Sequence, residues 1–252
     1  MSIASPGPGT ADGSPDPFDQ LYRRDGGGYG ERGSDLLTSY LTQCGRGGNA
    51  IDLGAGNGRD SLELLRRGFN VTAVDRSPAG LERLKRTARE VATQRDAALG
   101  QLDTQCVDVR DWVWNGLKYD ALVATTVADH LSAADGRRLI AGMARSVSPE
   151  GVIYVEVHTV EDPASGVPPG MDRDVPISET AAEIKHYFRS GELLEWITTH
   201  TSGLRVLHYE ERREWDRTHG RPHGHGKAVV LATRADHYPN WYGRNQDFPM
   251  PR

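Results

Sequence analysis

Short runs of apolar residues alternate along this chain with segments in which apolar residues recur at helical spacing. The short runs are typical of buried strands and lie at residues 50–53, 71–74, 104–107, 119–126, 152–157, 205–211 and 228–233. Helical spacing occurs at residues 18–22, 36–41, 61–65, 78–97, 132–146 and 190–196. Strands that alternate with helices in this way predict an α/β domain with a mostly parallel sheet.

Three segments depart from this pattern. Residues 1–17 are rich in Pro, Gly and Ser and bury no apolar face, so we expect them to be disordered. The folded domain is expected to span residues 18–234, and residues 159–189, interrupted by prolines, are interpreted as a lid or substrate-binding insertion. Residues 235–252 form an aromatic C-terminal tail that either covers the pocket or pairs two subunits as a homodimer.

The stretch that indicates a ligand is the glycine turn after the first strand. Gly54, Gly56 and Gly58 let the backbone turn sharply and let a ligand approach the main chain. Asp75 ends the second strand close to the ~20-residue offset at which a carboxylate accepts hydrogen bonds from a ribose. The ligand is therefore expected to contain a nucleoside.

The spacing of these glycines distinguishes between two nucleoside cofactors. A dinucleotide fingerprint is G-x-G-x-x-G, whereas this turn is G-x-G-x-G and follows Asp52. A carboxylate there would repel a pyrophosphate and attract an amino group. An amino acid joined to a nucleoside is favoured over a nicotinamide dinucleotide, so an oxidoreductase is the less favoured alternative.

The turn also resembles a known motif. Ile51-Asp-Leu-Gly-Ala-Gly-Asn-Gly-Arg-Asp-Ser-Leu62, followed by Gly68-Phe-Asn-Val-Thr-Ala-Val-Asp75, resembles motif I of the class I S-adenosylmethionine-dependent methyltransferases, and most closely the tellurite-resistance branch. Ala55 stands where that branch often has cysteine. The similarity extends over roughly Tyr22 to Arg234. It implies a Rossmann-like fold with a mostly parallel seven-stranded sheet and helices on both faces, and S-adenosylmethionine as the cofactor.

The resemblance also implies roles for residues at the carboxyl ends of the strands. Asp108 is expected to contact the adenine amino group, and the amide of Val109 its ring nitrogen. The expected cofactor-binding residues are Asp52, Gly54, Ala55, Gly56, Gly58, Asp75, Arg76, Asp108, Val109 and Thr125. His130 and His158 fall at the same edge of the sheet; His130 is expected either to cap a turn or to join the catalytic residues, and His158 is left as a core-edge residue.

The segment 216–227 carries the densest set of functional side chains. In the similar branch the corresponding loop has a His-Arg pair near the substrate; here Arg217 matches, but Asp216 replaces the histidine. His223 and His225 are two residues apart and would share a face of an extended segment. Three interpretations are open for these histidines: substrate binding or base catalysis, metal binding, or a solvated loop. We favour the first, with His225, His223, Arg217 and His130 as the catalytic residues and no metal.

Composition restricts the partners. The chain has 252 residues, a formal net charge of −5 and two cysteines, Cys44 and Cys106. This charge gives no general attraction to nucleic acid, and no apolar run is long enough to span a membrane. Without a disulfide framework a cytoplasmic location is expected.

These patterns together predict an enzyme that transfers the methyl group of S-adenosylmethionine to an oxygen, nitrogen or chalcogen atom of a small molecule, in specialised metabolism or detoxification. The alternative is the same fold used for non-methylating chemistry such as cyclisation.

Overall fold

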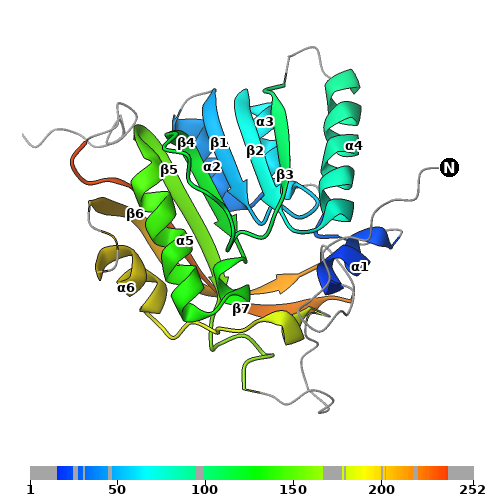
Figure 1. Cartoon of the computed structure of the whole chain (residues 1–252). Helices are drawn as coiled ribbons and strands as arrows, with labels where there is room; N and C mark the ends of the chain where they lie inside the picture. Colours follow the sequence, from blue (N-terminus) through cyan, green and yellow to red (C-terminus); the bar gives the residue numbers. More distant parts are fainter. Residues whose placement is uncertain are drawn as a thin grey trace, which may run out of the picture.

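The computed structural model describes residues 16–24, 28–30, 32–44, 47–94, 99–166, 178, 180–199, 201, 203–217 and 221–237. Seven strands form one sheet in the order β3-β2-β1-β4-β5-β7-β6 (Figure 1). The strands are β1 Gly48–Leu53, β2 Phe69–Asp75, β3 Leu102–Cys106, β4 Tyr119–Thr125, β5 Val147–His158, β6 Leu204–Asp216 and β7 His223–Arg234. The helices are α1 Pro17–Arg23, α2 Asp35–Cys44, α3 Arg59–Arg66, α4 Pro78–Gln94, α5 Ala133–Ser146 and α6 Glu192–Thr199, with 3₁₀ turns η1 Ala128–His130 and η2 Ala181–Glu183.

The sheet is mostly parallel, as the alternation of strands and helices predicts. Strands β3, β2, β1, β4 and β5 pair in parallel, and β7 is antiparallel to both β5 and β6. Parallel neighbours bring the carboxyl ends of their strands to one edge. The loops after β1, β2, β3 and β4 therefore converge on the same side of the molecule, below the sheet in Figure 1.

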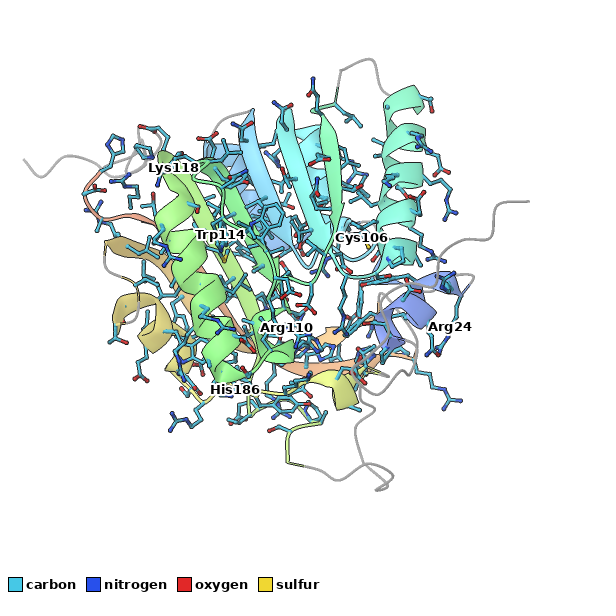
Figure 2. All side chains as sticks on the ribbon, in the orientation of Figure 1. Arg24, Cys106, Arg110, Trp114, Lys118 and His186 are labelled. Carbon is cyan, nitrogen blue, oxygen red and sulfur yellow. The ribbon has the colours of Figure 1, made fainter. Side chains whose placement is uncertain are left out.

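Two apolar layers cover the sheet. The first contains Leu139, Ile140 and Met143 of α5 and Trp196 of α6. The second contains buried leucines of α2, α3 and α4. Side chains on both faces of the strands are buried, which explains why these strands appear in the sequence as continuous apolar runs. Figure 2 shows the side chains filling the space between the helices and the sheet.

The N-terminal boundary differs from the prediction. The α1 helix begins at Pro17, and the carboxylate of Asp16 caps it by accepting hydrogen bonds from the amides of Phe18 and Asp19 at 2.9 and 3.1 Å. Aspartate followed by proline is a strong helix start, so placing residues 16 and 17 in a disordered segment was wrong. Residues 1–15 lie outside the described residues.

The C-terminal strands are longer than expected. β6 extends to Asp216 and β7 begins at His223, so half of the segment 216–227, predicted as a histidine-rich loop, is sheet. His223 and His225 are both buried, and residues two apart along a strand lie on the same face. The aromatic residues of the C-terminal tail and residues 167–177 of the insertion lie outside the described residues. No helix in the described ranges is long and apolar enough to cross a membrane.

Candidate functional site

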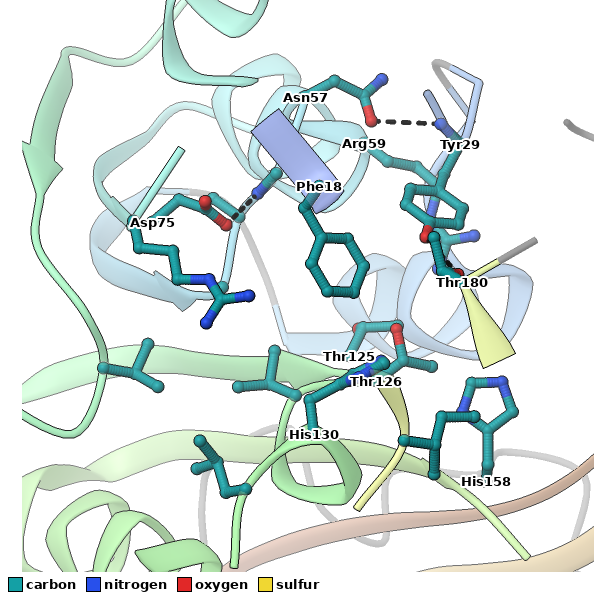
Figure 3. A pocket seen from close by; sticks show the side chains of 18 of the residues that line it. Phe18, Tyr29, Asn57, Arg59, Asp75, Thr125, Thr126, His130, His158 and Thr180 are labelled. Carbon is teal, nitrogen blue, oxygen red and sulfur yellow. Dashed lines mark hydrogen bonds between the residues drawn. The ribbon is translucent and has the colours of Figure 1, made fainter. Parts of the chain in front are cut away.

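A large cleft opens at the carboxyl edge of the strands, with about 1280 Å³ of empty space when the open solvent at its mouth is counted. Its floor comes from the loops after β1, β2, β3 and β4, one wall from β5 to β7, and its roof from α1 and the segment 178–185. Figure 3 shows Phe18 of the roof above Thr125, Thr126 and His130. A cleft at the carboxyl ends of parallel strands is where α/β proteins bind small-molecule ligands.

The glycine turn has the backbone that its sequence predicts. Gly54, Gly56 and Gly58 all have positive φ, of 74°, 54° and 88°. A Cβ on Gly56 would clash with the hydroxyl of Tyr22 in the roof, because the turn passes directly beneath it. Gly54, Ala55 and Gly56 line the cleft. Gly58 does not; it precedes α3 and packs against Leu84.

Asp75 fixes the shape of this turn. Its carboxylate accepts a hydrogen bond from the amide of Gly56 at 2.8 Å and another from the amide of Ser77 at 2.7 Å. The side chain is buried and lines the cleft. Burial raises its pKa, although both amides oppose the rise. Asp75 therefore connects the glycine turn to the end of β2 and still faces the cleft.

Asp52 lies beneath the same turn, and its carboxylate is suited to pair with a cationic group of a ligand. It is buried and accepts a hydrogen bond from the hydroxyl of Ser61 at 2.6 Å. Burial, and next the nearby carboxylate of Asp60, raise the pKa of Asp52 to about 7. A positive ligand group at this position would favour the ionised form.

Arg59 is a cleft residue that sequence reasoning missed as a ligand contact. It follows the glycine turn as the first residue of α3. Its nearest carboxylate contact among the described residues is Asp60, at 3.8 Å, which is too long for a hydrogen bond. Figure 3 places it beside Tyr29, on the opposite side of Phe18 from Asp75. A guanidinium in a cleft, with no carboxylate of the described residues within hydrogen-bond distance, is suited to bind a planar anion such as a carboxylate.

The residues predicted to contact the adenine also line the cleft. Asp108 and Val109 line it, and Arg110 forms a two-pronged ion pair with Asp108 at 2.7 and 2.9 Å. Figure 2 shows Arg110 at the carboxyl edge of the sheet. Arg76 lines the cleft as well and binds Asp16 at 2.6 Å, which holds α1 in place.

Hydroxyl groups of residues in the roof and in the floor shape the inside of the cleft. The hydroxyls of Tyr29 and Thr180 lie 3.0 Å apart, so the N-terminal segment contacts the insertion after β5. The hydroxyl oxygen of Thr125, at the end of β4, is buried and has no hydrogen-bond partner among the described residues. A buried hydroxyl of this kind is suited to a ligand that supplies the missing bond.

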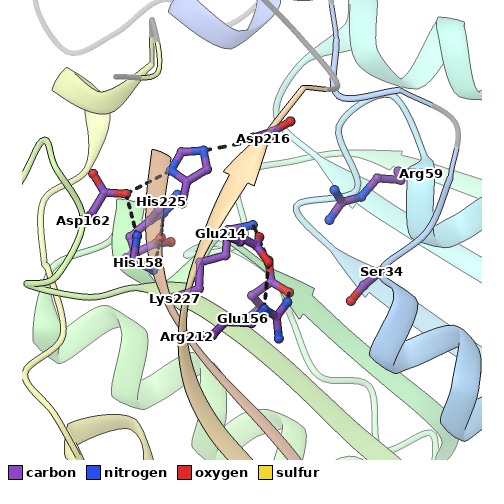
Figure 4. A network of polar contacts seen from close by, with 12 residues as sticks. Ser34, Arg59, Glu156, His158, Asp162, Arg212, Glu214, Asp216, His225 and Lys227 are labelled. Atoms are coloured by element: carbon purple, nitrogen blue, oxygen red, sulfur yellow. Dashed lines mark hydrogen bonds and ion pairs between the residues drawn. The ribbon is translucent and has the colours of Figure 1, made fainter. Parts of the chain in front are cut away.

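Histidines gather at the other end of the cleft (Figure 4). Nδ1 of His225 bonds a carboxylate oxygen of Asp162 at 2.9 Å, and Nδ1 of His158 bonds Asp129. The two imidazole rings lie 4.7 Å apart, and both line the cleft. His130 lines the cleft too, with its Nδ1 3.0 Å from the carbonyl of Glu183.

Two predicted catalytic residues do not line the cleft. His223 is buried behind His225, with the ring centroids 4.7 Å apart, and it does not line the cleft. Arg217 is exposed one residue beyond the end of β6 and is not among the residues that line the cleft, although Asp216, the last residue of β6, is. That Arg217 faces the acceptor therefore stays a prediction.

A buried ionic network supports this wall. Nζ of Lys227 lies 2.7 Å from Glu156 and 3.0 Å from Glu214, and Arg212 lies 3.7 Å from Glu156 (Figure 4). Although burial opposes ionisation, Lys227 and Arg59 hold the pKa of Glu156 at about 2. The network keeps three strands in register beneath the histidines.

Residues 50–151 match a family model described as a methyltransferase domain. These residues therefore resemble a methyltransferase domain, and the seven-stranded, mostly parallel sheet has the class I methyltransferase fold. This domain implies S-adenosylmethionine as its cofactor, and Asp52, Arg59 and the buried hydroxyl of Thr125 are chemically suited to its ammonium, carboxylate and polar groups. A comparison with curated protein sequences gives no match.

Solved structures share the fold of this methyltransferase domain at low identity. TehB from Haemophilus influenzae is 20% identical with a TM-score of 0.60; the alignment covers 80% of this chain but only 62% of TehB. A methyltransferase from Methanosarcina mazei is 16% identical with a TM-score of 0.61, over 81% and 98% of the two chains. Magnesium protoporphyrin IX methyltransferase from Synechocystis, solved with bound S-adenosylmethionine, is 16% identical with a TM-score of 0.53, over 79% and 77%.

Proposed function

We propose that the protein transfers the methyl group of S-adenosylmethionine to a nucleophilic atom of a small molecule. The observation that carries this proposal is the cleft itself. The glycine turn and Asp75 occupy one part of it, the histidines occupy another, and the roof closes over both. A cofactor on the turn would thus have room for a small acceptor beside it, within a wall of imidazoles.

The proposed cofactor pose follows from charge. The ribose lies at Asp75 and the adenine at Asp108 and Val109, while the ammonium lies near Asp52. The carboxylate lies at Arg59, on the side of the cleft away from Asp75 (Figure 3). Each pairing puts an ionic or hydrogen-bonding group opposite its complement.

The acceptor would lie between the cofactor and the histidines. The sulfonium is already a strong electrophile, so the protein contributes mainly by aligning the acceptor and excluding water. We propose His225 and His158 as acceptor-facing residues. The insertion supplies Ser178, Thr180, Ile184 and Lys185 to the lining, which supports its role as a substrate-facing lid.

The direct test compares S-adenosylhomocysteine with NAD. S-adenosylhomocysteine at about 100 times its Kd should stabilise the fold by roughly 2.7 kcal/mol, measured by thermal unfolding and calorimetry, whereas NAD should have no effect. Asp75→Ala should weaken the binding by about 1.5 to 3 kcal/mol, as expected for a lost charged hydrogen bond. The absence of any shift with saturating S-adenosylhomocysteine would refute the proposal.

Product analysis then separates methyl transfer from cyclisation. Methyl transfer releases one S-adenosylhomocysteine for each molecule of product, and the product gains a methyl group. A cyclisation that uses the same fold would change the substrate without consuming the cofactor. Incubation of S-adenosylmethionine with candidate acceptors, followed by mass spectrometry of both products, distinguishes the two reactions.

A further inference from the structure

We infer that His158, Asp162 and His225 form a binding site for a divalent transition-metal ion at the acceptor end of the cleft. One ligand atom from each of the three lies within 4.8 Å of the others. All three side chains are buried, with 7%, 5% and 5% of their surfaces exposed. Two imidazoles and one carboxylate are the donor set preferred by ions such as zinc, iron(II) and cobalt(II), and not by magnesium or calcium.

The backbone fixes these three residues relative to one another. His158 ends β5, Asp162 lies in the turn that follows, and His225 lies on the neighbouring strand β7. The amide of Thr159 donates to the carbonyl of Gly226 at 2.8 Å, which ties the turn to β7. A Cβ on Gly226 would clash with the backbone of Asp162, so glycine at this position is what lets the turn approach the strand.

The hydrogen bonds around His158 have the form found at metal sites. A metal-bound histidine usually donates its second ring N–H to a carboxylate or carbonyl, which orients the ring. Nδ1 of His158 bonds the fully buried carboxylate of Asp129, which also accepts from the backbone amide of His158 at 2.9 Å. The Nε2 atom of His158 is thereby left for the cleft, towards which its ring points in Figure 3.

The charge balance also favours a cation. Asp129 and Asp162 are buried carboxylates, yet among the described residues no lysine or arginine nitrogen lies within 4.0 Å of either. The second oxygen of Asp129, Oδ1, is buried and has no hydrogen-bond partner among the described residues. Glu156, by contrast, has Lys227 at 2.7 Å. The amides of Ala164 and Gly226 donate to the carboxylate of Asp162, and Nδ1 of His225 contacts it. A full positive charge stabilises a buried carboxylate further, and an ion at His158, Asp162 and His225 would provide it.

Sequence reasoning favoured histidines that act without a metal, because it considered the segment 216–227 alone. The fold adds His158 and Asp162 to His225. Zinc binds imidazole nitrogen and carboxylate oxygen at about 2.0 to 2.2 Å, so donor atoms this close can reach one ion by small side-chain rotations. That the histidines act without a metal stays a prediction, and a metal titration distinguishes it from the metal site.

Such an ion would define the acceptor class, a consequence that rests on the proposed methyl transfer. An ion at this end of the cleft would bind the oxygen of a hydroxyl acceptor and lower the pKa of that hydroxyl. The hydroxyl proton passes to solvent. The O–CH₃ bond then forms as the sulfur–CH₃ bond breaks, and the cofactor leaves as S-adenosylhomocysteine. The acceptor is therefore expected to carry a hydroxyl group.

The test titrates zinc chloride and cobalt(II) chloride separately into full-length protein that has been dialysed against a chelator and then freed of it. One equivalent of either ion should bind by calorimetry, and the cobalt form should show the visible absorption of an ion with nitrogen ligands. His158→Gln, Asp162→Asn and His225→Gln should each abolish this binding. Asp129→Asn should weaken it by about 10- to 100-fold, as expected for a residue that orients a ligand.

The matched control is His186→Gln. His186 also pairs with a carboxylate, Glu192 at 3.0 Å, but it lies outside the cleft (Figure 2), so this variant should bind one equivalent normally. Every variant is checked for S-adenosylhomocysteine binding, which should persist and shows that the fold is intact. Binding of S-adenosylhomocysteine without stoichiometric metal binding, or metal binding that survives all three ligand substitutions, overturns the metal site and leaves the proposed methyl transfer standing. Metal binding without S-adenosylhomocysteine binding would support the metal site and refute the proposed methyl transfer.

Discussion

Single residues in the cleft are expected to recognise different parts of the cofactor. Asp75 and the glycine turn were identified from sequence because their spacing is local. Arg59 was not identified, although it lies within the same motif. Only the folded chain shows that, among the described residues, no carboxylate lies within hydrogen-bond distance of its guanidinium. Two predictions follow from the charges of Arg59 and Asp52.

Arg59→Gln should weaken the binding of S-adenosylhomocysteine but leave the binding of 5′-methylthioadenosine unchanged. The second ligand has the same nucleoside and lacks the amino-acid carboxylate that Arg59 is proposed to bind. Loss of a hydrogen-bonded charge pair should cost about 1.5 to 3 kcal/mol, measured by calorimetry with both ligands. An equal loss with both ligands would show that Arg59 acts on the fold of the turn instead.

The affinity for S-adenosylhomocysteine should fall as the pH drops below about 7. The pKa of Asp52 in the free protein is about 7, and only the ionised form attracts an ammonium group, so protonation competes with binding by at most about tenfold per pH unit. Calorimetry from about pH 8 to about pH 6 should reveal this slope, and Asp52→Asn should bind more weakly and remove it. A slope that persists in the variant would assign the effect to another group.

At the scale of elements, β5, β6 and β7 form the wall that carries the histidines. Their extra length was not predicted, because the polar residues of 212–216 and the glycines of 224–226 look like a loop. Arg212 and Glu214 of this segment nevertheless have partners of opposite charge on other strands of the sheet. Lys227 of β7 contacts Glu156 of β5 and Glu214 of β6, so burial of charge is offset by opposite charge.

Lys227→Met should therefore lower the free energy of unfolding by about 3 to 5 kcal/mol, since it leaves buried carboxylates without their main cation. The double variant Glu156→Gln with Lys227→Met should recover part of this loss. Arg234→Met removes one partner of an ion pair with the exposed Asp236, and should change the free energy of unfolding much less, because solvent screens the pair. Urea unfolding measures all three, and equal costs for Lys227→Met and Arg234→Met would contradict the role of the network.

At the scale of the whole molecule, the cleft needs parts of the chain that are far apart in sequence. The roof is α1, the floor is the set of loops after β1 to β4, and the far wall is β5 to β7. Arg76 binds Asp16, and Tyr29 contacts Thr180 across 151 positions of sequence. The roof and the insertion thus close one site, which no single segment of the chain contains.

The sequence by itself determined the α/β architecture, the glycine turn and the class of cofactor, because apolar periodicity and glycine spacing reflect local geometry. The length of β6 and β7 and the ion pair that joins Asp16 to Arg76 depended on how segments meet. The same holds for the histidines. His158 bonds Asp129 over 29 positions of sequence and His225 bonds Asp162 over 63, and such contacts form only when the sheet aligns its strands.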